Sequence, residues 1–204
     1  MFFQTLNVGK LRNNCYILSG DGANAVIIDP ATEAAKIEAA LMVARLAPTA
    51  VLLTHGHFDH HGAARRLQEA GAEIYLNKSD WVLIKKGMGF VLPKAFTPDH
   101  DLTDGQILTL AGLTIRVIAT PGHTPGGVCF LFESINRPLL FSGDTLFHTD
   151  VGRTDFPGGD FATLKKSILE KLYTLPPETL VYPGHEEETT IGEEREHNTV
   201  VRAK

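Results

Sequence analysis

The segment from His55 to His61 places four histidines and one aspartate within seven residues. An apolar run before it, Ala50–Thr54, is predicted to be a strand. A helix is predicted after it, over Ala63–Ala70. A strand end has no structural need for several imidazoles, because clustered imidazoles desolvate one another and repel when protonated. A bound cation removes that cost, so the cluster predicts a metal centre at a strand-to-helix junction.

The spacing within the cluster divides its side chains between two ions. Side chains at positions i and i+2 of an extended segment point the same way, so His55 and His57 can share one ion. Asp59 and His60 then turn away and can bind a second ion. His61 has no partner in this scheme. We expect it to support the ligands or to start the following helix.

Three further candidate ligands follow predicted strands later in the chain. Each comes directly after a glycine, whose conformational freedom lets the backbone aim the next side chain at a common centre. These candidates are His123, Asp144 and His185. A single histidine of this kind is usually a surface residue. The repetition of strand, glycine and ligand alongside the first cluster favours one shared metal site.

The rest of the chain alternates strands and helices and predicts an α/β protein with mixed sheets. Short apolar or alternating runs predict further strands at Phe3–Val8, Cys15–Leu18, Ala25–Ile28, Ile74–Leu76, Ile107–Leu110, Thr114–Ala119, Val128–Phe132, Leu139–Phe141 and Leu180–Tyr182. Further helices are predicted from a cap at Thr32 to about Ala47, where Pro48 stops the helix, from Ser79 or Asp80 through Ile84, from a cap at Asp160, and over Ile191–Asn198. Residues 87–101 are expected to form a long loop.

Composition limits the class of protein. The 204 residues suffice for one domain with a sizeable core, and we expect a single domain over residues 1–204. A net charge of −5 without a basic stretch argues against nucleic acid as a partner. No window approaches the roughly 20 apolar residues of a membrane span, and the N-terminus does not read as a secretory signal. Cys15 and Cys129 form no CxxC pair and are expected to be buried and reduced, as in a cytoplasmic protein.

Residues Thr54–His60 read Thr-His-Gly-His-Phe-Asp-His and resemble the THxHxDH signature of the metallo-β-lactamase superfamily. The later ligand candidates match that family's motifs in the same order, so the resemblance covers nearly the whole chain. It implies a four-layer αβ/βα sandwich, in which helices flank two mixed β-sheets and the metals lie at the edge between the sheets. It also implies the ligand sets: His55, His57 and His123 for a first ion, Asp59, His60 and His185 for a second, and Asp144 as a bridge between them.

Within the superfamily, the chain is most similar to short single-domain glyoxalase II-like proteins, the hydroxyacylglutathione hydrolases. That resemblance rests on Asn14–Tyr16, Gly152–Phe156 and Thr190–Arg195. It implies a hydrolase with two divalent metal ions, zinc first and iron or manganese as alternatives, whose metal-bound hydroxide cleaves a small thioester or ester. Asp59 or Asp144 would orient that hydroxide. Because the familiar β-lactamases of the superfamily carry a cysteine where Asp144 lies, antibiotic hydrolysis is disfavoured.

Two residues are candidates for binding the substrate. Arg153 stands where glyoxalase II places a lysine that holds the glutathione carboxylate, and His148 lies in the loop after Asp144. Arg153 could instead pair with Asp155. Asp155 replaces the family's substrate-holding tyrosine and would repel an anion, so the resemblance is weaker for glutathione recognition than for hydrolysis.

Several alternatives stay open. The stretch Gly152–Phe156 also occurs in mononuclear iron persulfide dioxygenases of the superfamily, which are the alternative function. A non-catalytic module is disfavoured because all seven ligands are present. Glu186 stands where a glycine is usual and could tune the second metal, whereas the acidic residues of the tail otherwise indicate a solvated face. The oligomeric state is left open.

Overall fold

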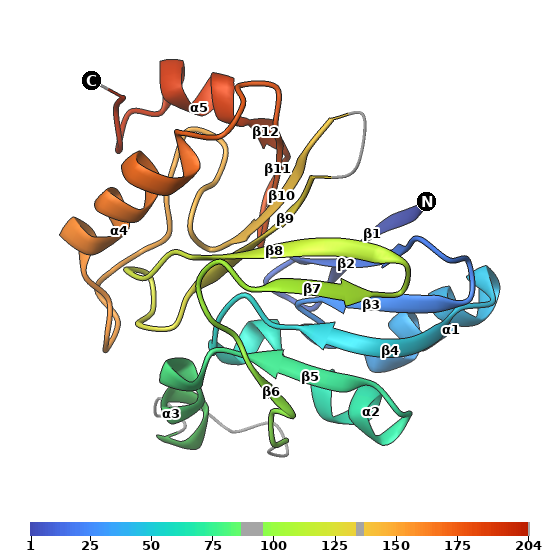
Figure 1. Ribbon diagram of the computed structural model, residues 1–204. Coiled ribbons are helices and arrows are strands. Elements are labelled where there is room, and N and C mark those ends of the chain that lie inside the picture. The colour runs from blue at the N-terminus through green and yellow to red at the C-terminus, as the bar shows by residue number, and fades with distance from the viewer. Residues whose placement is uncertain (87–95, 134–136, 204) are drawn as a thin grey trace.

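Two six-stranded mixed sheets with helices beside them make up the structure (Figure 1). The computed structural model describes residues 1–86, 96–133 and 137–203. Strands of the first sheet follow the chain order: β1 (Phe2–Val8), β2 (Asn13–Ser19), β3 (Asn24–Ile28), β4 (Ala47–Leu52), β5 (Glu73–Leu76) and β6 (His100–Asp101). β1 to β3 pair antiparallel, and β3 to β6 pair parallel.

The second sheet reverses the chain order, from β12 to β7. Its strands are β7 (Ile107–Leu110), β8 (Leu113–Ala119), β9 (Val128–Phe132), β10 (Leu139–Gly143), β11 (Leu180–Pro183) and β12 (Thr189–Thr190). Only the β10–β11 pair among these is parallel. The helices are α1 (Ala34–Ala44), η1 (Phe58–His60), α2 (Ala64–Glu69), α3 (Lys78–Lys86), α4 (Phe161–Ser167), its π-helical continuation η3 (Ile168–Leu172), and α5 (Ile191–His197).

Alternation along the strands divides the apolar side chains among three cores. In β2, Ile17 packs on the side of α1, α2 and α3, whereas Tyr16 and Leu18 face the second sheet. In β10, Phe141 faces the first sheet, whereas Leu140 packs in the core that contains α4, η3 and α5. Three cores between four layers confirm the predicted αβ/βα sandwich, and both faces of each sheet are covered.

The ends of several strands meet at one edge of the sandwich. β8, β10 and β11 run in the same direction, because β9 is antiparallel to both β8 and β10 and β11 is parallel to β10. The Val128 N–H donates to the Thr54 carbonyl at 2.8 Å and joins the end of β4 to this edge. The Asn14 N–H donates to the Gly184 carbonyl at 2.8 Å and joins the start of β2 to it. The segments that carry the predicted ligands therefore lie side by side.

α1 differs from the prediction at both ends. It begins after Glu33, which has a left-handed backbone with φ of 54°, so Thr32 is not its cap. It is closed by Arg45, also left-handed with φ of 58°, before the predicted end at Ala47. A residue other than glycine adopts the left-handed conformation only at an energetic cost. The sequence pattern does not reveal that the two ends of α1 do so.

Two strand features were also not predicted. β4 includes Pro48, which the sequence suggested only as a helix stop. The β3–β4 register shifts between Ala25 and Val26, beside Pro48, and such a bulge tolerates a residue without an N–H. β6 lies within the predicted loop 87–101 and extends the first sheet. The part of that loop prediction over residues 87–95 lies outside the described residues.

The predicted caps have mixed outcomes. Asp160 accepts the Thr163 N–H at 2.7 Å and caps α4, as predicted. At α3, the Asn77 side chain accepts the Ser79 N–H at 2.9 Å, so neither Ser79 nor Asp80 is the cap. Asp80 has another partner, described below.

The acidic tail is less exposed than predicted. α5 confirms the predicted helix, but Glu194 is fully buried. Its carboxylate accepts hydrogen bonds from the Thr149 N–H, the Thr189 hydroxyl and the Asn198 side chain. This buried carboxylate fastens the tail to the loop after β10 and is not part of a solvated face.

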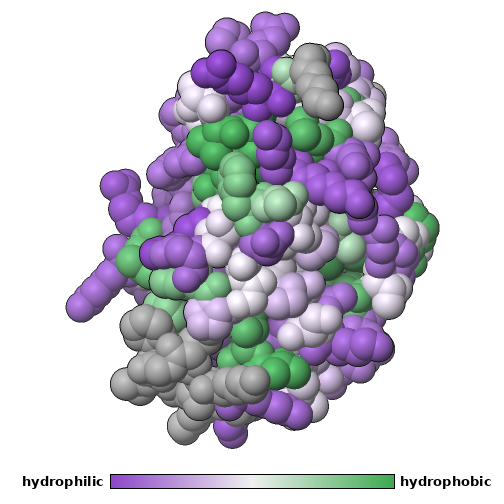
Figure 2. Space-filling model, turned by 90° about the vertical axis from the view of Figure 1, so that its left-hand side faces the viewer, coloured by the Kyte–Doolittle hydropathy of each residue, from purple (hydrophilic) through white to green (hydrophobic). Residues whose placement is uncertain are grey.

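Hydrophilic residues surround several separate hydrophobic areas on the face shown in Figure 2. Within the described ranges, no helix has the length and apolar character needed to cross a membrane. Cys15 and Cys129 are buried with free thiols, as predicted. Burial raises the pKa of both thiols, that of Cys129 to about 11, so neither presents a reactive thiolate.

Candidate metal centre

Three buried imidazoles form the first group of predicted ligands. His55 and His57 follow β4, and His123 follows β8, and one nitrogen from each lies within 4.8 Å of the others. Among the described residues, the Nε2 atoms of all three are buried without a hydrogen-bond partner. An unpartnered buried nitrogen is costly, and three that converge fit a cation that accepts their lone pairs.

Asp59, His60 and His185 form the second group, again with one ligand atom each within 4.8 Å. His185 Nε2 lies 3.4 Å from Asp59 Oδ2, and His60 Nε2 lies 3.8 Å from the same oxygen. Two imidazoles and a carboxylate that converge in this way suit zinc, iron or manganese alike.

Asp144 lies between the two groups. Its Oδ1 is 3.4 Å from His60 Nε2, and its Oδ2 is 3.6 Å from His123 Nε2 and 3.7 Å from His185 Nε2. Its carboxylate therefore contacts a member of each group. The structure thus brings all seven predicted ligand side chains to one edge of the sandwich, in the two groups that the resemblance implied.

Backbone and carboxylate oxygens orient the imidazoles. His123 Nδ1 lies 2.7 Å from the Arg153 carbonyl, and His185 Nδ1 lies 3.2 Å from the Leu11 carbonyl. A carbonyl only accepts, so in the neutral ring Nδ1 carries the proton and Nε2 keeps its lone pair. This tautomer leaves the inward nitrogen free to bind a metal.

Asp29 ties the two groups together, and sequence reasoning missed this role. It directly follows β3, and its Oδ2 accepts the Thr54 hydroxyl at 2.6 Å and lies 3.0 Å from His60 Nδ1. The Thr54 hydroxyl lies 3.0 Å from His55 Nδ1. Asp29 is buried and has a left-handed backbone with φ of 48°. A carboxylate directly after a buried strand was the available signal, but its partners lie far away in sequence.

Asp80 of α3 is a second missed residue. Its Oδ2 accepts the Gly56 N–H at 2.8 Å, and its Oδ1 accepts the Gly126 N–H at 2.6 Å. Gly56 lies between two ligands of the first group, and Gly126 lies in the loop of the third, His123. One fully buried carboxylate thus holds both loops that carry the first group.

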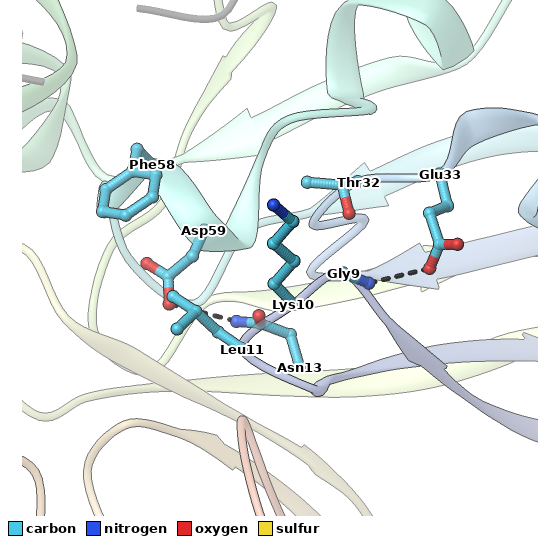
Figure 3. A pocket seen from close by; sticks show the side chains of 8 residues that line it. All are labelled: Gly9, Lys10, Leu11, Asn13, Thr32, Glu33, Phe58 and Asp59. Carbon is cyan, nitrogen blue, oxygen red and sulfur yellow. Dashed lines mark hydrogen bonds between the residues drawn. The ribbon is translucent and has the colours of Figure 1, made fainter. Parts of the chain in front are cut away.

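Asn13 lies against the second group. Its Nδ2 is 3.2 Å from Asp59 Oδ2, 3.3 Å from His60 Nε2 and 3.2 Å from His185 Nε2. The amide donates to the Asp59 carboxylate and backs the second group from the start of β2 (Figure 3). Such a partner fixes the orientation of a ligating carboxylate.

Electrostatics separate the imidazoles into two kinds. Burial and the neighbouring imidazoles lower the pKa of His55, and they lower that of His57 to about 4. Both rings are therefore neutral, as a metal ligand must be. Burial opposes ionisation of His60 as well, but the carboxylates of Asp144 and Asp29 raise its pKa above the ordinary value. Burial opposes ionisation of Asp144 too, yet the imidazoles around it lower its pKa.

The predicted substrate residues lie differently. Arg153 lines the pocket of about 370 Å³ at the metal groups, together with Phe156 and Leu11. Its guanidinium pairs with Asp155 through two hydrogen bonds of 2.8 and 2.7 Å and stacks 3.8 Å from the Phe156 ring centre. His148 Nδ1 instead lies 2.7 Å from Glu187, and His148 is not among the residues that line this pocket.

Glu186 shows why glycine is usual at its position. It has φ of 66°, in the left-handed region that glycine adopts most easily. The Asn14 side chain donates to its carbonyl at 2.9 Å and holds this conformation. The departure from the family's pattern therefore leaves the backbone after His185 in the conformation that a glycine would take.

His61 is a core residue. Its ring packs edge-on against Phe96 at 5.3 Å, and burial lowers its pKa to about 4. Its carbonyl accepts the Ala64 N–H at the start of α2, in line with the predicted place at a helix start.

Replacing His61 with phenylalanine is expected to leave the metal content unchanged and to shift the free energy of unfolding by less than about 1.5 kcal/mol, because the buried ring packs against Phe96 and its Nδ1 has no hydrogen-bond partner among the described residues. The adjacent substitution His60→Phe is expected to lower the metal content. Elemental analysis and thermal unfolding of both variants test this contrast, and metal loss in His61→Phe would contradict it.

Comparison with known proteins gives a consistent result. A family model described as the metallo-beta-lactamase superfamily matches residues 8–185. The hydroxyacylglutathione hydrolase GloC of Haemophilus influenzae is 38% identical, with 100% of both chains covered. The B3 metallo-beta-lactamase BLEG-1 superposes with a TM-score of 0.90 at 36% identity, over 99% of this chain and 100% of that one. TTHA1623, solved in a di-iron-bound form, superposes with a TM-score of 0.86 at 38% identity, over 96% and 98%.

Proposed function

The chain belongs to the metallo-β-lactamase superfamily, and we propose that it is a dinuclear metallo-hydrolase that cleaves the thioester of a small acylated thiol. Hydroxyacylglutathione is the first substrate to test. The observation that carries the proposal is the convergence of two groups of three ligand atoms with one carboxylate between them. The 38% identity to GloC, which is named a hydroxyacylglutathione hydrolase, supports the choice of substrate.

The candidate ligands form two sets, one for each proposed ion. His55, His57 and His123 would hold one ion and Asp59, His60 and His185 the other, and Asp144, which contacts members of both groups, would serve both. When bound, two divalent cations supply a nucleophile from water at neutral pH and polarise the carbonyl under attack. We assign zinc first, with iron or manganese as alternatives.

Asp59 and Asp144 are the acceptors that can orient the attacking water. Both carboxylates stay ionised, because the neighbouring imidazoles outweigh the effect of burial and lower the pKa of each. The water oxygen ends on the acyl carbon, the carbon–sulfur bond breaks, and the products are a carboxylic acid and a thiol. A thiolate is a good leaving group, so no strong general acid is required beside it.

Arg153 is the proposed contact for the carboxylate of the thiol arm. Its guanidinium lies at the rim of the metal pocket but is held by Asp155. Replacing Asp155 with asparagine is expected to lower KM for a glutathione thioester by about twofold to fivefold, because an exposed ion pair competes with the substrate for the cation. Arg153→Met is expected to raise KM. Steady-state kinetics measure both effects, and an unchanged KM in both variants would remove Arg153 from the substrate site.

Metal analysis combined with activity tests the proposal as a whole. Protein purified without added metal is expected to contain two ions per chain and to hydrolyse S-lactoylglutathione. One iron per chain, oxygen uptake on glutathione persulfide and no thioester cleavage would favour a persulfide dioxygenase instead. A chromogenic β-lactam belongs in the same assay, because BLEG-1 is described as a B3 metallo-beta-lactamase. Cleavage of the β-lactam without cleavage of the thioester would overturn the proposed substrate class.

A further inference from the structure

A second pocket of about 580 Å³ lies beside the metal pocket. We call it the side pocket; its lining residues are Gly9, Lys10, Leu11, Asn13, Thr32, Glu33, Phe58 and Asp59 (Figure 3). Leu11, Phe58 and Asp59 also line the metal pocket. The two pockets are therefore neighbours across these shared side chains, and a substrate of modest length can occupy both.

The walls of the side pocket are held in place by the folded chain. The Gly9 N–H donates to the Glu33 carboxylate at 2.8 Å (Figure 3). A Cβ atom on Gly9 would lie 2.7 Å from the Thr32 hydroxyl oxygen, so the loop between β1 and β2 packs directly on the segment before α1. Gly9 has φ of 74°, which favours glycine at this turn. The pocket is thus a preformed feature of two loops fixed to each other, as ligand sites usually are.

The exposed surface of the walls is mostly apolar, and its charged side chains are Lys10, Glu33 and Asp59. Leu11 and Phe58 are 55% and 40% exposed, which is unusual for large apolar side chains beside a polar metal site. Lys10 is exposed, and its ammonium makes no ion pair or hydrogen bond with the described residues. In Figure 3 that ammonium points into the pocket, whereas the Glu33 carboxylate faces the Gly9 backbone.

Two cations therefore flank the metal groups from different pockets. Arg153 lies at the rim of the metal pocket, and Lys10 lies in the side pocket. A thioester has two arms, the thiol and the acyl group. With the thiol arm assigned to the Arg153 side, the acyl arm is directed past Leu11 and Phe58 toward Lys10. An apolar passage that ends at an unpaired ammonium suits a short alkyl chain with a terminal carboxylate.

On the basis of the proposed thioester hydrolysis, we propose that the side pocket is the acyl subsite and that it selects half-thioesters of short dicarboxylic acids. The acyl methylenes contact Leu11 and Phe58, and the terminal carboxylate pairs with Lys10 Nζ. Lys10 is a specificity residue in this arrangement and takes no part in bond cleavage.

A matched pair of substrates isolates this contact. S-succinylglutathione and S-butyrylglutathione share the thiol and the acyl length and differ in the terminal group, a carboxylate or a methyl. The measured quantity is the ratio of their kcat/KM values with the metal-loaded enzyme. In Lys10→Met, which keeps an unbranched side chain one atom shorter and removes the charge, the ratio is expected to fall by about fivefold, the effect of a partly exposed ion pair. In Lys10→Glu it is expected to fall further, because two carboxylates then repel.

Arg12→Met is the matched control. Arg12 is an exposed cation of the same loop that does not line the side pocket, so the variant changes the net charge equally and should keep the ratio within twofold. The subsite is refuted if both thioesters are cleaved and the ratio in Lys10→Met equals that of the parent. If the metal-loaded parent cleaves S-lactoylglutathione but neither of these two thioesters, the subsite is refuted and the proposed function stands. If it cleaves none of the three, the proposed function itself is wrong and the subsite with it.

Discussion

Replacing Asp144 with asparagine is expected to lower kcat/KM by at least about a thousandfold and to reduce the metal content. Its carboxylate contacts His60, His123 and His185 at 3.4 to 3.7 Å and so belongs to both ligand groups. The amide has the same shape but no negative charge, and one of its two polar atoms can only donate. A thousandfold loss corresponds to about 4 kcal/mol of transition-state stabilisation, which is the scale expected when a metal-based charge is misplaced.

A matched variant separates this effect from the general loss of a carboxylate. Asp104→Asn removes the same charge from a partner of Lys171 and should retain activity within about twofold. Elemental analysis, circular dichroism and kinetics are measured on both proteins. Full metal content together with activity within tenfold of the parent in Asp144→Asn would contradict the bridging role.

The candidate ligand residues could be selected because each stands out in its local sequence. A single histidine after a strand is usually a surface residue, but His123, Asp144 and His185 all follow strands that end at one edge, and this repetition favours one shared site. The parallel direction of these strands then brings residues distant in sequence together. The four layers were implied by the resemblance to the superfamily, whereas the apolar runs themselves predicted only an α/β protein with mixed sheets.

The residues that hold the ligands could not be predicted, because their partners are distant in sequence. Asp29 bonds to His60 and Thr54, and only the folded chain brings these residues together. In the sequence, Glu194 cannot be distinguished from the other acidic residues of the tail. In the structure it accepts hydrogen bonds from Thr149 and Thr189. A single sequence carries no signal for such pairs, since a buried carboxylate is distinguished from an exposed one by its donors.

Pro48 illustrates a different limit. Proline lacks an N–H and usually ends regular structure, so a helix stop was the natural interpretation. The structure places it within β4 beside a register shift, where a missing N–H costs little. The pairing of β3 with β4 depends on contacts across the sheet, and it outweighs the tendency of proline to end regular structure.

Asp80 lies outside the two groups of candidate ligands but holds the loops that carry the first group. Its two oxygens accept the backbone N–H groups of Gly56 and Gly126. A Cβ atom at either glycine would lie within 2.8 Å of Asp80 atoms, so both loops approach α3 too closely for any side chain. The glycine within His55–His57 is therefore needed for this approach. Burial raises the pKa of Asp80. A buried carboxylate costs free energy unless hydrogen-bond donors are present to stabilise it.

Asp80→Ala is therefore expected to destabilise the protein by about 2–5 kcal/mol, because two buried N–H groups lose their acceptor, and to release the ion of the first group before that of the second. The melting temperature should fall by roughly 5–15 °C for a chain of this size. Asp101→Ala is the matched control, because Asp101 accepts the Lys78 N–H of the same helix at 2.8 Å but contacts neither glycine. Competition with a chelator, followed by elemental analysis, measures the order of metal release. Equal retention of both ions in Asp80→Ala and Asp101→Ala would show that the two loops hold the His55, His57 and His123 imidazoles without the carboxylate that joins them.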